Sequence, residues 1–270
     1  MPPTRLPCWH DLTTGDVAGT VARDPVLILP LAAVEQHGPH LPLSTDLDIG
    51  MGLLESAFRH LDPAFPAYLL PPQAVGTSME HRNFPGTLSL PPESLIGIIA
   101  QLGESLARSG VRRLVLCNSH GGNRQVMDLA ALRLRLEHRL LVVKASYFRL
   151  SPPEDLRLPV TELRHGLHGG AVETAMMLHL RPDAVRMDQA TTAVSLGQTL
   201  ERDLSRLGPE GEASFAWLAE DLNASGVVGE AVLATAAMGE RLVEHYGAVL
   251  ADVIREARTF PLAALGGGRE

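Results

Sequence analysis

The side chains best suited to chemistry lie in one short polar segment that follows an apolar, strand-like run. Glu35, His37, His40 and Asp46 fall within twelve residues of this segment. Carboxylates and imidazoles without thiolates suit zinc, manganese or iron(II), and they do not suit an iron–sulfur cluster. The segment therefore predicts a metal centre, and a pair of ions held there could make hydroxide at neutral pH.

The spacing of these residues predicts how they reach the ions. Side chains of an extended backbone alternate with a period of two, so Glu35 and His37 point the same way and could reach adjacent ions. Asp46 could return to the same place after the turn at residues 39–42 and bridge both ions through its two oxygens. His40 is expected to orient a ligand from outside the metal shell.

Two later segments contain further candidate ligands. His120 lies in the glycine-containing run at residues 118–123, directly after a second apolar run. Glu173 falls in the first turn of a predicted helix, where the positive end of the helix dipole stabilises an ionised carboxylate. We expect Asn118 and Asn123 to support the ligands by hydrogen bonding.

Two other chemistries fit parts of the sequence less well. A glycine-rich turn after a strand can hold a phosphate. Residues 118–123, however, contain neither the dinucleotide fingerprint nor a phosphate-loop lysine. Ser78 lies near His81 in sequence, but it lacks the Gly-x-Ser-x-Gly elbow of many serine hydrolases. Metal-assisted hydrolysis is the favoured interpretation.

The elements that must position these residues alternate between strands and helices. Apolar runs predict strands at 26–31, 67–70, 114–117 and 140–143, and periodicity predicts helices at 48–61, 92–109, 124–137, 170–180 and 230–259. A further strand is expected within 188–226, and residues 150–168 are expected to be irregular. This rhythm is typical of a mostly parallel sheet covered by helices on both faces, with sites outside the carboxyl ends of the strands. No linker divides the chain, so we predict one domain over residues 1–270.

Composition restricts the partners and the compartment. The 270 residues are 45% hydrophobic, and 23 basic against 31 acidic residues give a net charge of −8, which disfavours nucleic-acid binding. Neither a secretory signal nor a membrane-spanning apolar stretch is evident. The two cysteines, Cys8 and Cys117, provide no disulfide framework. We predict a cytoplasmic protein that binds neither nucleic acid nor membrane.

Five motifs resemble those of the creatininase family, also called creatinine amidohydrolases. They are Glu35-Gln36-His37-Gly38-Pro39-His40-Leu41-Pro42 with Thr45-Asp46, Gly76-Thr77-Ser78 through Phe84-Pro85-Gly86-Thr87, Asn118-Ser119-His120-Gly121-Gly122-Asn123, His168-Gly169-Gly170 through Glu173-Thr174, and Gly226-Val227-Val228-Gly229 with Gly239-Glu240. The resemblance covers most of the chain in order. It implies a three-layer αβα fold, a dinuclear metal site, hydrolysis of a carbon–nitrogen amide bond and a homohexamer.

The resemblance also implies which residue holds which ion. By position, Glu35 and His120 would hold one ion, His37 would hold the other, and Asp46 would lie between both. Zinc is the favoured metal, and manganese or iron would also suit these ligands. The cofactor prediction is therefore two divalent ions.

Two further roles and one departure follow from the same resemblance. His168 would transfer protons, and Ser78 would face the substrate. In the creatinine-hydrolysing members a tyrosine and a glutamate follow the histidine of the third motif, whereas this chain has Gly121 and Gly122. The second ion therefore loses a carboxylate ligand, and Glu173 is the nearest candidate to replace it.

The substrate is predicted only as a class. Leu167 replaces the acidic residue that precedes the catalytic histidine in those members, and the expected tryptophan of the aromatic wall is missing. These departures disfavour creatinine itself. The predicted reaction is hydrolysis of a cyclic amide, a formamide or a short peptide by a metal-bridging hydroxide. The alternative is a catalytically inactive metal-binding or regulatory member of the same fold.

Overall fold

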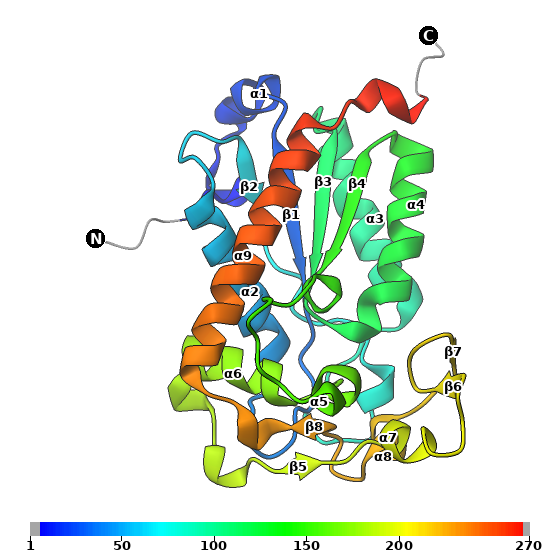
Figure 1. Ribbon diagram of the computed structural model, residues 1–270. Helices are drawn as coiled ribbons and strands as arrows, with labels where there is room; N and C mark the ends of the chain where they lie inside the picture. Colours follow the sequence, from blue (N-terminus) through cyan, green and yellow to red (C-terminus); the bar gives the residue numbers. More distant parts are fainter. Residues whose placement is uncertain (1–5, 267–270) are drawn as a thin grey trace.

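Four parallel strands form the central sheet of the computed structural model, which describes residues 6–266 (Figure 1). The strands are β1 (Val26–Leu31), β2 (Ala67–Leu69), β3 (Arg113–Asn118) and β4 (Leu141–Ser146), in the order β2-β1-β3-β4. The register places Val26 of β1 opposite Ala67 of β2 and Arg113 of β3. All four carboxyl ends therefore lie at one edge of the sheet.

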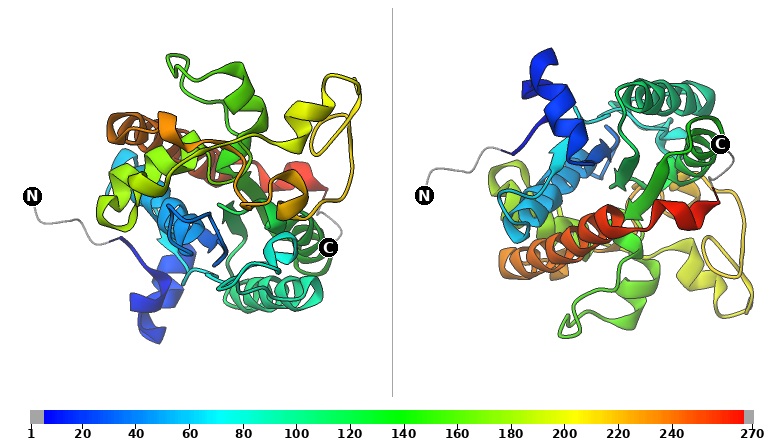
Figure 2. Two further views of the ribbon diagram at one scale, coloured as in Figure 1. Left: turned by 90° about the horizontal axis from the view of Figure 1, so that it is seen from below. Right: turned by 90° about the horizontal axis from the view of Figure 1, so that it is seen from above.

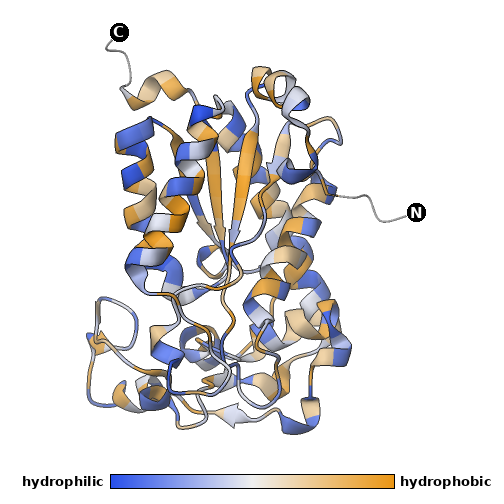
Figure 3. Ribbon diagram, turned by 180° about the vertical axis from the view of Figure 1, so that it is seen from behind, coloured by the Kyte–Doolittle hydropathy of each residue, from blue (hydrophilic) through white to orange (hydrophobic). Residues whose placement is uncertain are grey.

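Helices cover both faces of the sheet because successive strand residues point to opposite sides. Ile28 and Val115 belong to the core under three helices: α2 (Thr45–His60), α6 (Ala171–Leu180) and α9 (Ala236–Thr259). Leu27 and Leu114 belong to the core under two helices: α3 (Pro92–Arg108) and α4 (Arg124–His138). The strands between these layers are strongly hydrophobic (Figure 3). The predicted three-layer αβα class with a parallel sheet is confirmed.

Short elements gather at the carboxyl ends of the strands, seen from below in Figure 2. They are α5 (Val160–His165), α7 (Leu196–Leu200), α8 (Ala219–Leu222), the antiparallel pair β5 (Thr192–Ala193) and β8 (Gly229–Glu230), and the parallel pair β6 (Leu207–Gly208) and β7 (Ala213–Ser214). Helix α1 (Thr14–Ala22) lies near the opposite end of the sheet. The second half of the chain therefore adds these short elements to the loops that follow the strands at the carboxyl edge.

Two predicted helix starts are wrong, and a cap explains the second of them. Helix α2 begins at Thr45 and not at 48, which places Asp46 in its first turn, where the helix dipole stabilises a carboxylate. Helix α9 begins at Ala236 and not at 230, because the Thr235 hydroxyl accepts a hydrogen bond from the Met238 amide.

Three further expectations concern the connecting segments. Residues 150–168, expected to be irregular, contain helix α5. The strand expected within 188–226 is replaced by three two-residue strands, β5, β6 and β7, outside the central sheet. Within residues 6–266, no helix combines the length and apolar character needed to cross a membrane. The single-domain organisation and the cytoplasmic location stay predictions.

Candidate metal centre

Four segments deliver buried polar side chains to the carboxyl edge of the sheet. Glu35 follows β1, and His120 follows β3, which is paired with β1. Asp46 and Glu173 lie in the first turns of α2 and α6, two helices that pack against each other. Adjacent strand ends and two helix amino termini thus place these carboxylates and this imidazole around one point.

The first ligand group consists of Glu35, Asp46 and His120, all of which are buried. The Nδ1 atom of His120 lies 3.2 Å from Glu35 Oε1 and 3.1 Å from Asp46 Oδ2. One nitrogen and two carboxylate oxygens therefore face a common centre.

The second ligand group consists of His37, Asp46 and Glu173. The Nε2 atom of His37 lies 3.3 Å from Asp46 Oδ1 and 4.0 Å from Glu173 Oε2. Asp46 thus belongs to both groups and directs a different oxygen to each. In each group the candidate ligand atoms lie within 4.8 Å of one another.

The hydrogen bonds of the two histidines define which nitrogens can bind a cation. His37 Nδ1 lies 3.2 Å from the Glu35 carbonyl oxygen, and His120 Nε2 lies 2.9 Å from the Thr77 carbonyl oxygen. Since a carbonyl oxygen only accepts, each of these nitrogens donates, and in the neutral ring the other nitrogen carries a lone pair. Those nitrogens face carboxylates, an arrangement that is favourable only when each nitrogen carries a proton or a metal ion lies between it and the carboxylates.

Buried polar atoms support the same interpretation. Among the described residues, Glu35 Oε2 is buried without a hydrogen-bond partner, and the polar neighbours of the buried atoms His37 Nε2 and Asp46 Oδ2 are other candidate ligand atoms. A buried carboxylate without a partner is costly, and metal coordination is one way to satisfy it. The nitrogen and oxygen donor set therefore fits divalent ions of the zinc, manganese or iron(II) type.

The carboxylates and imidazoles shift one another's pKa values strongly. Burial alone would lower the pKa of His37, but the charges of Asp46, Glu173 and Glu35 outweigh burial and raise it to about 9. Burial alone would raise the pKa of Glu35, but the charge of His120 holds it well below its ordinary value. The pKa of His120 is likewise raised, because Glu35 and Asp46 outweigh burial. The cluster thus attracts positive charge.

His168 lies beside the two ligand groups and forms a further candidate group with Glu35 and His37, but its pKa shifts in the opposite direction from those of His37 and His120. Its Nδ1 atom is 3.7 Å from Glu35 Oε1, and its Nε2 atom donates to the Gln36 carbonyl oxygen over 2.6 Å. Its ring centroid lies 4.1 Å from that of His37. Burial and the charge of His37 lower the pKa of His168. A neutral imidazole with a free Nδ1 lone pair can exchange protons with a substrate.

The three residues predicted to support the ligands make hydrogen bonds around them. Asn118 accepts from the His120 amide and donates to the His120 carbonyl oxygen, and Asn123 accepts from the Thr77 amide. These amides hold the loop that carries His120. His40 Nε2 lies 3.0 Å from the Thr174 hydroxyl, next to Glu173 in the chain.

Ser78 occupies a different place from the one expected of a substrate contact. Its side chain is fully buried, and its hydroxyl lies 3.3 Å from His120 Nε2. It is not among the residues that line the large cavity described below. The structure therefore places Ser78 behind the His120 ring, and its contact with substrate stays a prediction.

Three residues at the site were not singled out from the sequence. His81 stacks on His168 with ring centroids 4.2 Å apart, and its Nε2 lies 3.5 Å from Glu35 Oε1. Tyr147, directly after β4, donates to Glu173 Oε1 over 3.2 Å. Glu80 Oε1 lies 3.9 Å from His120 Nε2. The signal for Tyr147 was its place after a strand; His81 and Glu80 lie in a motif already noted for its polar residues.

A Cβ atom at Gly122 would have no room in this arrangement. It would lie 2.2 Å from the Thr77 carbonyl oxygen, 2.5 Å from His120 Nε2 and 2.6 Å from Glu80 Oε1. A glutamate at this position, as in the creatinine-hydrolysing members, would therefore need a different local backbone. The conformation of this loop therefore requires glycine at position 122, and the Glu80 carboxylate lies next to that glycine.

A cavity of about 1070 Å³ opens over the cluster. Its floor includes Glu35, Asp46, His120, His168 and Glu173. Its walls carry apolar and aromatic side chains from loops of the second half of the chain, among them Phe148, Phe215 and Trp217. A polar floor under apolar walls is typical of a small-molecule or peptide site.

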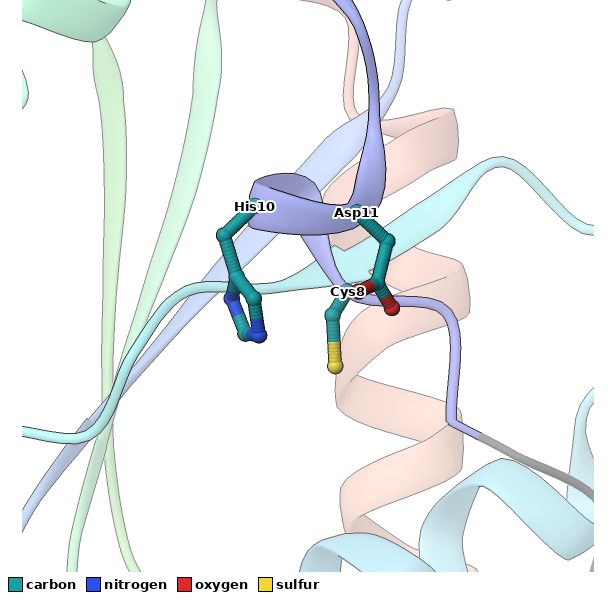
Figure 4. Close-up of side chains that lie close together, drawn as sticks. All are labelled: Cys8, His10 and Asp11. Carbon is teal, nitrogen blue, oxygen red and sulfur yellow. The ribbon is translucent and has the colours of Figure 1, made fainter.

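A further group of possible ligands lies away from this cavity. Cys8, His10 and Asp11 come together on the short 3₁₀ turn Trp9–Asp11 (Figure 4). His10 and Asp11 are exposed, and none of the three lines the cavity. This group therefore plays no part in the carboxyl-edge cluster.

Comparison with known proteins agrees with this geometry. A family model for creatininase, described as creatinine amidohydrolase, matches residues 10–254. The mycofactocin precursor peptide peptidase of Mycolicibacterium smegmatis is 33% identical over 235 residues, which cover 86% of this chain and 85% of that protein.

Two solved structures share the fold. One, described as creatininase Mn, has a TM-score of 0.74 and 27% identity, and the match covers 95% of this chain and 100% of that one. The other, a creatininase mutant of the Zn–Zn type, has a TM-score of 0.72 and 29% identity, with coverage of 96% and 100%.

The fold, the buried histidine–carboxylate cluster and these relatives define a metal-dependent amidohydrolase. The chain belongs to the creatininase family.

Proposed function

We propose that this enzyme hydrolyses a carbon–nitrogen amide bond of a short peptide, using two divalent ions held at the carboxyl edge of the sheet. The observation that carries the proposal is the pair of ligand groups that share Asp46. A carboxylate that directs one oxygen to each group is the arrangement expected between two neighbouring ions.

In this proposal each ion has three protein ligands. Glu35, Asp46 and His120 hold one ion, while His37, Asp46 and Glu173 hold the other. Zinc is favoured, and manganese or iron would suit the same donors. When bound, the ion pair supplies a nucleophile at neutral pH and a Lewis acid for the scissile carbonyl. The chain supplies the rigid, buried frame that keeps the ligands aligned.

His168 is the proposed proton-transferring residue. Its Nε2–H is fixed by the Gln36 carbonyl oxygen, so Nδ1 is the atom available for proton transfer. Its lowered pKa keeps the ring neutral, and Nδ1 can take a proton from the attacking water and return it to the departing nitrogen. General acid–base catalysis of this kind contributes about 10²–10⁴-fold. His168→Ala is expected to keep its metal and lose turnover by about that factor.

The size of the cavity, its apolar walls and one relative favour a peptide over creatinine. The cavity of about 1070 Å³ would remain mostly unfilled by a small cyclic amide. Its walls offer Phe148, Phe215 and Trp217 for apolar side chains of a peptide. The mycobacterial relative, at 33% identity, is named a precursor peptide peptidase. A cyclic amide or a formamide remains the second choice, because the hydrolytic floor would serve either.

The proposal is tested with purified protein treated with a chelator and then resupplied with zinc, manganese or iron(II). Each sample is assayed against creatinine, a lactam, N-formyl amino acids and short peptides, with products identified by mass spectrometry. The proposal expects peptide cleavage that disappears with the chelator and returns with a divalent ion. Cleavage that survives complete metal removal would contradict it. Metal binding without turnover of any amide would favour the inactive alternative.

We also propose that the chain forms a homo-oligomer, a hexamer by family resemblance. Helix α4 exposes Leu129, Leu132 and Leu136, which lie three and four residues apart on one helical face. Such a stripe supports burial against another subunit. Light scattering measures the mass, and a strictly monomeric mass at micromolar concentration would contradict this part of the proposal.

A further inference from the structure

Glu162 is a buried carboxylate outside the two ligand groups. It lies on α5, only 3% of its surface is exposed, and both of its oxygens accept hydrogen bonds from the backbone. Oε1 accepts from the Ala171 amide over 2.6 Å, and Oε2 accepts from the Glu230 amide over 2.6 Å. One side chain therefore joins α5 to the start of α6 and to the distant strand β8.

Glycines enclose this carboxylate on three sides. A Cβ atom at Gly166 or Gly170 would lie 2.5 Å from Glu162 Oε1, and one at Gly229 would lie 3.0 Å from Oε2. Gly229 also has a φ of 135°, a backbone conformation that other residues rarely adopt. The surrounding backbone is thus shaped to fit the carboxylate closely.

The two segments held by Glu162 are those that position His168 and Glu173. Ala171 is the first residue of α6, and Glu173 lies in the same turn. Glu230 is two residues beyond Val228, whose backbone pairs with that of His168: the Val228 amide donates to the His168 carbonyl over 2.9 Å. The turn between them is fixed further, since the Gly169 amide donates to Glu173 Oε2 over 2.6 Å.

We propose that Glu162 is a positioning residue for amide hydrolysis, which acts by fixing the turn that carries His168 and the first turn of α6. This inference rests on the proposed function, in which His168 transfers protons. Glu162 lines the same large cavity but belongs to neither ligand group, and the hydrogen bonds of both its oxygens go to backbone amides.

The chemistry of the two hydrogen bonds explains why a carboxylate is needed. Both oxygens of Glu162 accept from N–H groups, whereas a glutamine amide has one accepting oxygen and one donating nitrogen. In Glu162→Gln, one backbone N–H would face an NH₂ group and lose its acceptor, which is costly for a buried donor. Either the start of α6 at Ala171 or strand β8 at Glu230 would then lose its hydrogen bond to this side chain.

The test compares Glu162→Gln with Glu230→Gln, a matched change from carboxylate to amide on an adjacent strand. The substrate is the amide or peptide that the wild-type enzyme turns over fastest in the panel above. Glu162→Gln is expected to lower kcat by about 10–100-fold, the usual cost of removing a supporting group at a metal site. Its KM is expected to stay near the wild-type value and its ions at the first ligand group to remain. Glu230→Gln is expected to keep wild-type kcat, since Glu162 accepts from the Glu230 backbone amide, and a glutamine oxygen can still accept from the Thr161 hydroxyl.

A double-mutant cycle with His168→Ala separates positioning from a general loss of structure. If Glu162 acts through His168, adding Glu162→Gln to His168→Ala should lower kcat by less than about threefold, because residues that act as a unit are not additive. An equal loss in both backgrounds would overturn the inference. A raised KM with unchanged kcat would also overturn it, because that result indicates a substrate-binding role.

Two outcomes keep this inference distinct from the proposed function. If His168→Ala turns over like wild type, the role of His168 fails, and the positioning role fails with it. If His168→Ala loses turnover but Glu162→Gln does not, only the positioning role is overturned. Should Glu162→Gln fail to fold, Glu162→Asp takes its place in the same cycle, because it keeps two accepting oxygens on a side chain one methylene shorter. Glu162→Asp must then also lower kcat by less in the His168→Ala background than in the wild-type background.

Discussion

The two ligand groups of the metal centre differ in the burial of their side chains and in the distances between their ligand atoms. Glu35 and His120 follow paired strands, are buried, and approach each other to 3.2 Å. In the second group, His37 and Glu173 are 4.0 Å apart, and Glu173 is 15% exposed on the first turn of a helix. Asp46 contributes to both. The first group is therefore the more rigid half of the centre.

This difference between the two groups predicts a difference in their affinity for metal ions. A preformed, buried set of ligands loses little conformational freedom when an ion binds, whereas a partly exposed carboxylate at a helix start must be ordered. Glu173 is also the candidate replacement for a ligand that the loop at Gly122 has no room to provide. We therefore expect the first group to bind its ion more tightly than the second.

The largest effect is expected from removing the residue that the two groups share. Asp46→Ala should lose both ions and lower turnover by at least about 10⁴-fold, because no ion remains to activate the nucleophile. Metal analysis and kcat measure this. Asp48→Ala, in the same helical turn, is the control and should keep two ions. An Asp46→Ala protein that retains both ions would remove Asp46 from its shared position.

Removing Glu173 should separate the two groups. Glu173→Gln is expected to lose the second ion, keep the first, and lower turnover by about 10²-fold, since one ion cannot clamp both reacting oxygens. His120→Ala should instead weaken the first ion. Isothermal titration with zinc distinguishes the two variants. If Glu173→Gln binds two ions as tightly as wild type, the second group is wrongly assigned.

A smaller change is expected from the tyrosine that supports Glu173. Tyr147→Phe deletes the hydroxyl that donates to Glu173 Oε1 and should weaken the second ion by about 10-fold, in the lower range for such supporting groups. The first ion should be unaffected. A competition assay with a chelator measures both affinities, and an equal weakening of the two ions would contradict the proposed difference between the groups.

The smallest effect is a pH dependence of stability. In metal-free protein the pKa of His37 is about 9, against an ordinary value of 6.5. Protonated His37 therefore stabilises the metal-free fold fully below pH 6.5, and this stabilisation is lost as the pH rises toward 9. In the loaded protein, an ion takes the place of that proton.

The difference in Tm between loaded and metal-free protein should consequently widen by several degrees between pH 6.5 and 9, since each kcal/mol of lost stability lowers Tm by about 2–4 °C in a chain of about 150–250 residues. His120, whose pKa is raised in the same way, acts in the same direction. Differential scanning fluorimetry at fixed metal concentration measures the gap. A constant or narrowing gap would show that neither histidine exchanges a proton for an ion.

Much of the fold was predictable because local signals agree with tertiary packing. The apolar run at β1 and the proline at the start of α3 each have one sensible interpretation, and both elements lie where expected. The start of α9 was missed because a cap at Thr235 overrides the apolar pattern before it. The tiny strands β5 to β8 are too short to leave a periodic signal.

Some residues of the site could likewise be predicted from the sequence, and others could not. Glu35 and His120 could be expected to meet, because the carboxyl ends of paired parallel strands share one edge. The position of His81 depends on a 3₁₀ turn, and that of Glu162 on a short helix in a segment without periodicity. No spacing rule predicts that such side chains reach the site, since their placement depends on contacts between distant loops.

The most direct test of the two-ion claim is anomalous diffraction from crystals of the protein loaded with zinc. The proposed centre predicts two anomalous peaks about 3.5–4 Å apart, one on each side of the Asp46 carboxylate. A single peak, or peaks that leave Asp46 unligated, would contradict it.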